Sequence, residues 1–313
     1  MEVMTLTYPL EINTVKLPEA VAAIGFFDGI HKGHQKVIQA AKHLAQKQNR
    51  QSVVITFFPH PSVVLKREEQ RMDYLTPLRE KEEILREMGI DKLYIITFNE
   101  QLSKLDPQEF INHFIVGLHI KHLVTGFDFS YGYKGKGTTE TIVNHANGNF
   151  DYTIIPKEEK NNEKISSTLI RQHLRQGQIK EMNELLGRCF AIRGKVIKGD
   201  QRGRTIGYPT ANLDIEDNYF LPKVGVYAVT VIVDDVRYQG MANLGYKPTF
   251  KDNMEKPSIE VHLFDYKNDL YGKELKIEWR NYIRDEMKFD HIDQLLNQIK
   301  QDEIEIRNFF DAK

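Results

Sequence analysis

Residues 21–34 read VAAIGFFDGIHKGH, and this stretch contains a strand, a turn and the start of a helix. The apolar run at 21–27 predicts a buried strand, and residues 33–48 carry apolar side chains at helical spacing. Between them, Asp28 and Gly29 predict a tight turn, and Gly33 allows a backbone or a ligand to approach closely. A strand that runs through such a turn directly into a helix is typical of an α/β domain.

The same alternation continues along the first part of the chain. Further strands are predicted at 51–57, 92–97, 121–125 and 152–155, and helices at 77–88 and 107–116. Right-handed crossovers join strands of this kind into a parallel sheet that is covered by helices on both faces. We therefore predict a doubly wound, Rossmann-like α/β domain over residues 1–185. Ligands bind such a sheet beyond the carboxyl ends of its strands.

The pattern changes near residue 186. One helix is predicted over 167–186, and short β runs follow it at 190–198, 225–233, 236–243, 258–264 and 273–279. Adjacent short strands favour an antiparallel barrel or sandwich, and the apolar spacing at 289–310 predicts a C-terminal helix. We therefore predict a second domain, residues 186–313, that is a mainly antiparallel β-barrel and ends in a helix.

Composition narrows the range of partners. The 313 residues carry a formal net charge of −1, and neither half has the basic excess of a protein that binds nucleic acid. Cys189 is the one cysteine of the sequence, which excludes an intrachain disulfide and a Cys₄ or Cys₂His₂ zinc site. The sequence shows neither a secretory signal nor an apolar run of about 20 residues, so we expect no membrane partner and a cytoplasmic location. The oligomeric state stays open.

Two histidines mark the first candidate site. His31 and His34 lie three residues apart at the start of the predicted helix, where they share one face. The free N–H groups and the dipole at a helix N-terminus favour an anion, so two imidazoles there suit a phosphate group. The alternatives are two ordinary surface histidines or half of a metal site. The glycines and the preceding buried strand favour the phosphate site.

Three other segments hold polar residues close to a strand end or a helix start. Residues 56–61 (TFFPHP) place His60 after the second predicted strand, and 126–132 (GFDFSYG) place Asp128 after the fourth. Residues 165–171 (ISSTLIR) open a helix, where Ser167 or Thr168 suits the N-cap position. Arg171, one turn further on, adds a guanidinium that suits phosphate.

Residues 198–213 (KGDQRGRTIGYPTANL) form the most unusual stretch of the second half. No Gly-Lys-Ser/Thr follows its glycines, so it is not a Walker loop, and a hairpin with a basic, glycine-rich tip is the plain interpretation. Thr210 and Asn212 are two residues apart and therefore face the same way on an extended segment. Their oxygens suit Mg²⁺ that also binds water and phosphate oxygens.

The first half resembles the H-x-G-H nucleotidyltransferases and, through the fuller pattern at 27–34, the prokaryotic FAD synthetases. The resemblance implies that ATP binds around the H-x-G-H element and that the loop at 126–132 lies on the flavin side. Ser130 and Tyr131 depart from the Arg-Phe that is more usual there, and Leu169 stands where arginine is frequent, which leaves Arg171 as the charge on that helix. The ligand-binding residues implied for this half are Gly25, Phe27, Asp28, Gly33, His60, Asp128, Ser167 and Thr168, with His31, His34 and Arg171 as catalytic residues.

The second half resembles the riboflavin kinases through their G-x-P-T-A-N signature, here 207–212, and through 223–227, 242–250, 260–265 and 284–289. The resemblance implies that Glu260 is the catalytic base and that Thr210 and Asn212 hold Mg²⁺. The nucleotide-binding residues that it implies for this half are Gly199, Arg202, Gly203, Gly207, Pro209 and Arg284.

Together the two resemblances identify the chain as similar to bifunctional enzymes that phosphorylate riboflavin to FMN and then adenylylate FMN to FAD. The implied substrates are riboflavin, FMN and ATP, with Mg²⁺ as cofactor and pyrophosphate as the second product of adenylylation. The alternatives are an enzyme with only one live activity and a non-enzymatic flavin-binding protein. A flavin-binding protein has no use for paired histidines, Arg171 and an aligned Thr/Asn pair.

Overall fold

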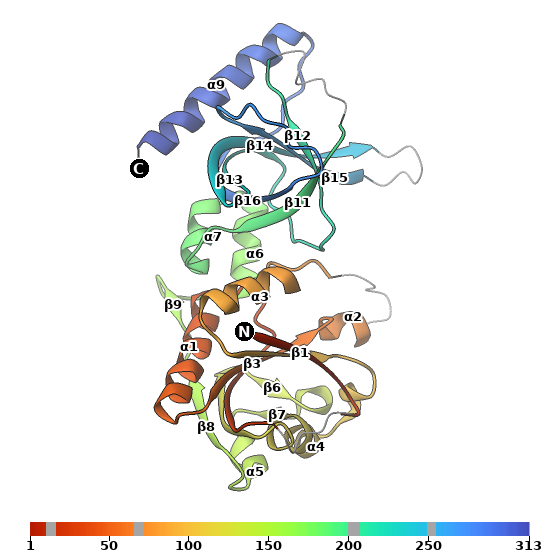
Figure 1. The fold of residues 1–313 in the computed structure, drawn as a ribbon, viewed down its shortest axis with the longest axis vertical. Coiled ribbons are helices and arrows are strands. Elements are labelled where there is room, and N and C mark those ends of the chain that lie inside the picture. The colour runs from red at the N-terminus through yellow and green to blue at the C-terminus, as the bar shows by residue number, and fades with distance from the viewer. Residues whose placement is uncertain (11–16, 66–71, 200–206, 249–254, 313) are drawn as a thin grey trace. The chain divides into compact units, whose positions relative to one another are not determined.

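The computed structural model describes residues 1–10, 17–65, 72–199, 207–248 and 255–312. The chain forms two compact units, Met1–Ser167 and Thr168–Lys313 (Figure 1).

The described residues of the first unit form a six-stranded parallel sheet with the order β1-β4-β3-β2-β5-β8. The strands are β1 (Glu2–Thr7), β2 (Ala20–Ile24), β3 (Gln51–Phe58), β4 (Lys92–Thr97), β5 (Ile120–Gly126) and β8 (Asp151–Ile155). The doubly wound α/β prediction is therefore confirmed. Strand β1 was not predicted, because only Leu6 of its six residues is buried and its sequence has little apolar signal.

Helices cover both faces of this sheet. Alternate residues of each strand point to opposite faces, so each strand contributes side chains to two cores. Val21 and Ala23 pack in one core with α1 (Lys32–Lys47) and α3 (Leu78–Glu87). Ala22 and Ile24 pack in the other core. That second face is covered by α4 (Pro107–Ile111), the π-helical turn η3 (Asn112–Val116) and α5 (Ile142–Ala146).

The strand order creates a topological switch beside β2. The chain passes from β2 to β3 and β4 on one side, and then returns to β5 on the other side of β2. At such a point the connections at the carboxyl ends of the strands diverge and leave a crevice for a ligand. The three segments that the sequence singles out after strands follow β2, β3 and β5, so all of them lie at this edge.

The described residues of the second unit form a closed antiparallel barrel, which confirms the predicted barrel. Its strands are β11 (Ala191–Ile197), β12 (Ala211–Asp214), β15 (Glu255–Leu263), β14 (Val236–Pro248), β13 (Gly225–Val233) and β16 (Glu274–Arg284), in spatial order. Strand β12 comprises four residues that were predicted only as an extended part of the glycine-rich stretch. Helix α9 (Ile292–Asp311) packs Ile306 against Ala228 and Met241 of the barrel.

The single helix predicted over 167–186 is wrong. The structure has two helices, α6 (Ser167–Gln176) and α7 (Ile179–Leu186), which are separated at Gly177. Gly177 has a φ of +75°, a conformation that glycine adopts without strain and that commonly ends a helix.

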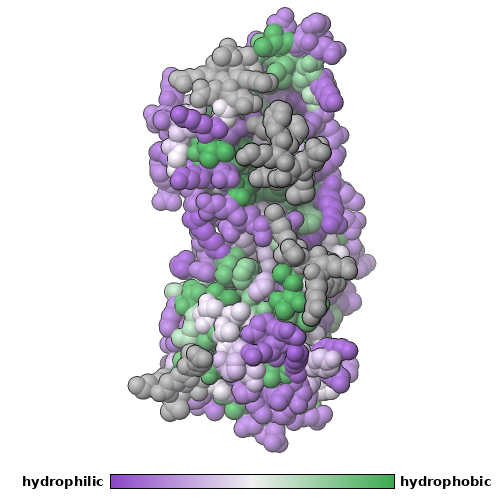
Figure 2. Space-filling model, turned by 90° about the vertical axis from the view of Figure 1, so that its right-hand side faces the viewer, coloured by the Kyte–Doolittle hydropathy of each residue, from purple (hydrophilic) through white to green (hydrophobic). Residues whose placement is uncertain are grey.

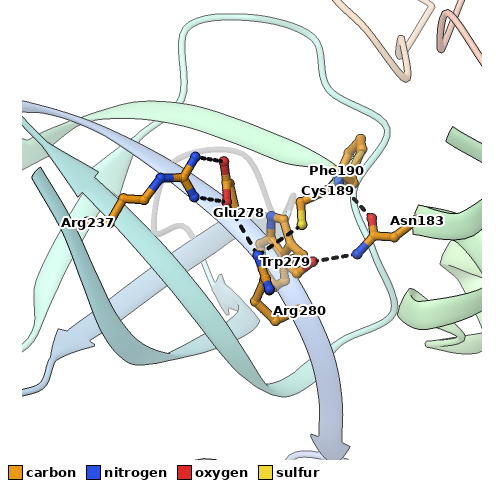
Figure 3. A network of polar contacts seen from close by, with 7 residues as sticks. All are labelled: Asn183, Cys189, Phe190, Arg237, Glu278, Trp279 and Arg280. Carbon is orange, nitrogen blue, oxygen red and sulfur yellow. Dashed lines mark hydrogen bonds and ion pairs between the residues drawn. The ribbon is translucent and has the colours of Figure 1, made fainter. Parts of the chain in front are cut away.

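Both helices are attached to the barrel. In α7, the Asn183 side chain donates to the Trp279 carbonyl (2.9 Å) and accepts from the Phe190 N–H (2.7 Å), as Figure 3 shows. In α6, the Leu174 carbonyl accepts from the Lys223 N–H (2.9 Å). The compact division therefore falls directly after Ser167, the first residue of α6, whereas the predicted boundary at residue 186 lies at the end of α7. That boundary stays a prediction about the extent of each functional domain.

The surface on the side seen in Figure 2 is mostly hydrophilic, with hydrophobic residues in scattered groups. Among the described residues, no helix combines the length and the apolar character needed to cross a membrane.

Candidate functional sites

A cavity of about 840 Å³ lies at the switch point of the first unit. Its lining includes the segments that follow β2, β3, β4 and β5. Its wall includes the predicted residues Gly25, Phe27, Asp28, His34, His60, Asp128 and Ser167. The same wall has a large apolar part, formed by aromatic and aliphatic side chains such as Phe57, Phe98 and Phe110. A flat aromatic ligand with a polar tail suits this combination.

His31 and His34 are stacked at the start of α1. Their ring centroids are 3.6 Å apart, and His31 is buried. His31 is the N-cap, and its Nδ1 accepts from the backbone N–H of His34 at 3.3 Å. Because Nδ1 accepts, Nε2 carries the proton of the neutral ring and can donate. A side chain at Gly33 would place its Cβ 3.2 Å from the His31 ring, so glycine leaves room for the stacked pair.

The turn that leads to these histidines is strained. Phe27 has a φ of +50° and Ile30 a φ of +38°, values that non-glycine residues rarely adopt. The Phe27 ring packs edge-on against His34 at 5.3 Å. A Cβ at Gly25 would lie 2.9 Å from that ring, so Gly25 must be glycine for this packing. Such strain persists only where the surrounding structure enforces it.

Asp28 supports the turn from inside. Its buried carboxylate accepts from the N–H groups of Leu75 (3.2 Å) and Thr76 (3.0 Å). Its carbonyl accepts from the Ser167 hydroxyl at 2.8 Å. Asp28 therefore connects the turn to two other segments, although it also lines the cavity.

His60 is held in one orientation at the end of β3. The Ser62 N–H donates to its Nδ1 at 3.1 Å, so the neutral ring carries its proton on Nε2. The His60 N–H donates to the Tyr74 hydroxyl at 3.2 Å, and the His60 ring packs edge-on against Phe26 at 4.4 Å.

The structure explains one of the two positions at which the loop after β5 differs from the more usual Arg-Phe. Tyr131 is buried, stacks on Phe129 and shares a hydrogen bond of 2.7 Å with His145, so it belongs to the core. Burial raises the pKa of the Tyr131 hydroxyl. Ser130 is exposed and lines the cavity. Asp128 forms an ion pair with Lys164 at 2.6 Å.

Arg171 and Thr168 belong to the second unit. Arg171 lies with its guanidinium 5.6 Å from the centre of the Phe220 ring, and Thr168 is exposed. Their role at a phosphate group stays a prediction.

Lys81 is a residue that the sequence analysis missed. It is buried on α3, and its Nζ donates to the Phe26 carbonyl at 2.7 Å, at the end of β2. The sequence contains a signal of this burial, because Lys81 is three residues after Leu78 and four before Leu85. A lysine at that spacing lies on the apolar stripe of the helix.

A second cavity, of about 430 Å³, lies in the second unit. Thr210, Glu260 and Arg284 line it. In the barrel, Asn212 of β12 is directly opposite Glu260 of β15, and Glu260 is opposite Asn243 of β14. Side chains paired across antiparallel strands share a face, so an amide, a carboxylate and a second amide form one row beside the cavity.

The segment before β12 is attached to the strand that carries Glu260. His262 donates from Nδ1 to the Pro209 carbonyl at 2.8 Å. The Tyr208 ring packs against His262 at 5.3 Å, and the Tyr208 hydroxyl donates to Glu303 of α9 at 3.1 Å. These contacts fix the backbone directly before Thr210, which lines the cavity.

Gly199 and Asn212 are packed together. A methyl group built on Gly199 would overlap the Asn212 side-chain amide, so glycine at 199 allows the amide to lie there. Gly207 has a φ of +84°, which favours glycine. Arg202 and Gly203, which were predicted to bind nucleotide, lie outside the described residues.

Arg284 has a strong protein partner. Its Nε and Nη2 donate to the two carboxylate oxygens of buried Asp302 at 2.8 and 2.7 Å. This bidentate pair joins β16 to α9. The guanidinium is therefore held as part of the cavity wall, and its predicted contact with nucleotide stays a prediction.

Comparison with known proteins matches two family models to two successive regions of the chain. A family model described as FAD synthetase matches residues 14–169, and one described as riboflavin kinase matches residues 186–310.

Relatives match over nearly the whole chain. Proteins named bifunctional riboflavin kinase/FMN adenylyltransferase from Listeria monocytogenes and Bacillus subtilis are each 43% identical, and the matches cover 99% of this chain and 98% of each relative. The Escherichia coli protein of the same name is 36% identical over 93% of this chain and 92% of its own. A crystal structure from Streptococcus pneumoniae, described as a macrolide-efflux protein, is 36% identical with a TM-score of 0.88. It covers 98% of this chain and 99% of its own.

Proposed function

This chain belongs to the family of bifunctional riboflavin kinases/FMN adenylyltransferases, and we propose that each of the two reactions takes place in the unit that resembles the corresponding family model. The enzyme phosphorylates riboflavin with ATP to give FMN, and then transfers AMP from a second ATP to FMN to give FAD. Its use of ATP favours a cytoplasmic location.

In the kinase reaction, the ribityl 5′-hydroxyl attacks the γ-phosphorus of ATP and must lose a proton. We assign Glu260 as the base. The observation that carries the assignment is the row Asn212–Glu260–Asn243 beside the cavity that Thr210 also lines. The Glu260 carboxylate lies in this row between two amide side chains, which do not titrate near neutral pH, and it is available to accept the proton.

The donor set beside Glu260 fits Mg²⁺. Thr210 and Asn212 supply one hydroxyl and one carboxamide oxygen, hard neutral ligands that leave the remaining positions to water and phosphate oxygens. With two protein ligands, such a metal would take its other ligands from water and the phosphates of ATP. When bound, Mg²⁺ offsets the negative charge that develops on the phosphates.

Removal of divalent metal is expected to abolish both reactions, because both use a triphosphate. Excess chelator should stop formation of FMN and of FAD, and added Mg²⁺ should restore both, as followed by flavin chromatography. Asn212→Ala should weaken the kinase reaction alone. Full kinase turnover in excess chelator would contradict the metal assignment, and a loss confined to adenylylation in Asn212→Ala would contradict the ligand assignment.

Gly199→Ala is expected to lower riboflavin phosphorylation by about 10- to 100-fold, the usual cost of displacing the support of a metal ligand. The new methyl group overlaps the Asn212 amide, which must move, while the φ of Gly199 is not positive and suits alanine. The fold should therefore be retained. Kinase and adenylylation rates of the same preparation are compared. Unchanged kinase activity would show that the position of the Asn212 amide is unimportant.

In the adenylyl reaction, the attacking group is the FMN phosphate, which is already ionised, so no base is required. Catalysis consists of positioning and of stabilising charge on the α-phosphate and the leaving pyrophosphate. We assign this to the imidazoles of His31 and His34 at the N-terminus of α1, together with Ser167. The roles that the resemblance implies for Arg171 and Thr168, which belong to the second unit, stay predictions. The apolar wall of the 840 Å³ cavity is assigned to the flavin ring.

One assay tests the whole assignment. Purified protein is incubated with riboflavin, ATP and Mg²⁺, and the flavins are separated by chromatography. FAD is the expected product. Accumulation of FMN alone would indicate one live activity, and unchanged riboflavin would indicate a binding protein.

A further inference from the structure

Lys81 is a buried cation for which the two reactions leave no role. It lies on α3 with 4% of its surface exposed, and it does not line the cavity. Burying a charged lysine is costly unless the ammonium group is well bonded. The structure provides two acceptors, the Phe26 carbonyl at 2.7 Å and the Thr56 hydroxyl at 3.0 Å.

These contacts converge on the carbonyl of Phe26. The hydroxyl of Thr56 also donates to that carbonyl, at 3.0 Å, so one backbone oxygen accepts from two buried side chains. The Lys81 ammonium also lies 4.9 Å from the centre of the Phe26 ring, whose residue lines the cavity. The next residue, Phe27, begins the strained turn with its φ of +50°.

Two groups therefore hold the turn from the same side. Asp28 accepts from Leu75 and Thr76, just before α3, and Lys81 donates to Phe26 from within α3. The strained Phe27 lies between these two anchors, the strained Ile30 follows the second of them, and His31 comes next. A turn with positive φ values relaxes when its anchors are removed.

We propose that Lys81 is a positioning residue for adenylyl transfer: its ammonium group holds the Phe26 carbonyl and so sets the path of the turn that carries His31 and His34. The proposal rests on the assignment of adenylyl transfer to these histidines. Lys81 does not touch substrate, so its effect is on the orientation of the donors rather than on binding.

The charge of Lys81 makes this role dependent on pH. Burial lowers the pKa of Lys81 to about 8, and the Asp28 carboxylate opposes this shift. The titratable groups around it are Asp28 on the turn, its buried helix neighbour Glu80, and His60 and Tyr74, which pack on the Phe26 ring. Above pH 8 the neutral amine donates more weakly, so adenylylation should fall.

The stability of the folded protein should rise over the pH range in which adenylylation falls. Between pH 8 and the ordinary lysine value of 10.5, the unfolded chain holds a proton on this residue that the folded chain has lost. The free energy of unfolding contributed by Lys81 therefore rises with pH across this window. A loss of activity that accompanies a gain of stability distinguishes positioning from a merely structural role.

The test compares Lys81→Met with Arg86→Met, which removes a charge from the exposed side of the same helix. Lys81→Met should lower kcat for FMN adenylylation by about 10²-fold, the typical cost of a misplacement of about 1 Å. The KM values should change little, and riboflavin phosphorylation should be unchanged. The alkaline fall in the activity of the unmodified enzyme should be absent in Lys81→Met. Arg86→Met should behave like the unmodified enzyme.

Two further variants keep the test decisive if Lys81→Met folds poorly. Thr56→Val removes the second donor to Phe26 and should lower kcat in the same way, and Lys81→Arg should keep its charge and lose the alkaline fall. Adenylylation that is unchanged in both Lys81→Met and Thr56→Val would overturn the proposal, as would a loss that follows only the fraction of unfolded protein. If His31→Ala also leaves adenylylation unchanged, the assignment of the site is wrong; if it does not, only the role of Lys81 is wrong.

Discussion

His31→Ala is expected to convert the enzyme into one that accumulates FMN. The substitution removes an Nε2–H donor from the stacked pair at the start of α1, and the loss of one preorganised donor lowers a rate by about 10²- to 10³-fold. The barrel contains none of the affected contacts, so riboflavin should be phosphorylated at the normal rate. Chromatography of flavins, started once from riboflavin and once from FMN, measures both steps.

The N-cap of α1 requires a separate control. His31 accepts from the His34 N–H, and loss of an N-cap acceptor costs about 1 kcal/mol of stability by itself. His31→Ser keeps an acceptor at this position without the imidazole, so it should retain stability and still lose adenylylation. His43→Ala makes the same change as His31→Ala at an exposed position of the same helix and should have no effect. Recovery of adenylylation in His31→Ser would show that capping, and not catalysis, is the role of His31.

The sequence was most informative where several signals coincided. The buried strand, the Asp-Gly turn and the histidines at 21–34 each have local causes, and together they predict both the parallel sheet and the place of its site. Strand β1 has no such signal, because an edge strand needs only one buried side chain, Leu6, to pack. The end of α6 was also missed, since glycine is tolerated inside helices and the αL conformation of Gly177 depends on its surroundings.

The partners of charged side chains were the least predictable part. Arg284 was expected at nucleotide, yet its guanidinium is paired with Asp302, which is 18 residues away on another element. Lys81 lies in a helix of mostly charged residues, and only its spacing from Leu78 and Leu85 indicates that it is buried. Such pairings are set by the tertiary arrangement of several elements, and a linear pattern contains no information on which partner is within reach.

Glu260→Gln is expected to stop the first reaction and spare the second. Glutamine has the shape of glutamate and can occupy the same place in the row between Asn212 and Asn243, but it cannot accept a proton at neutral pH. Loss of a general base lowers a rate by about 10²- to 10⁴-fold. Riboflavin should therefore persist, while FMN that is supplied directly should still be converted to FAD. The same two chromatographic assays measure this, with Glu274→Gln, an exposed change on β16, as the matched control.

The pair His31→Ala and Glu260→Gln also tests whether two sites exist. Each residue lies in a different compact unit: Glu260 lines the cavity of the second unit, and His31 stacks on His34, which lines the cavity of the first. If the sites are separate, a mixture of the two variants should make FAD from riboflavin, because Glu260→Gln adenylylates the FMN that His31→Ala releases. If either variant loses both reactions while its circular dichroism spectrum stays unchanged, the two sites are not separate. Failure of the mixture, with each single activity intact, would instead show that FMN passes between the sites without leaving the enzyme.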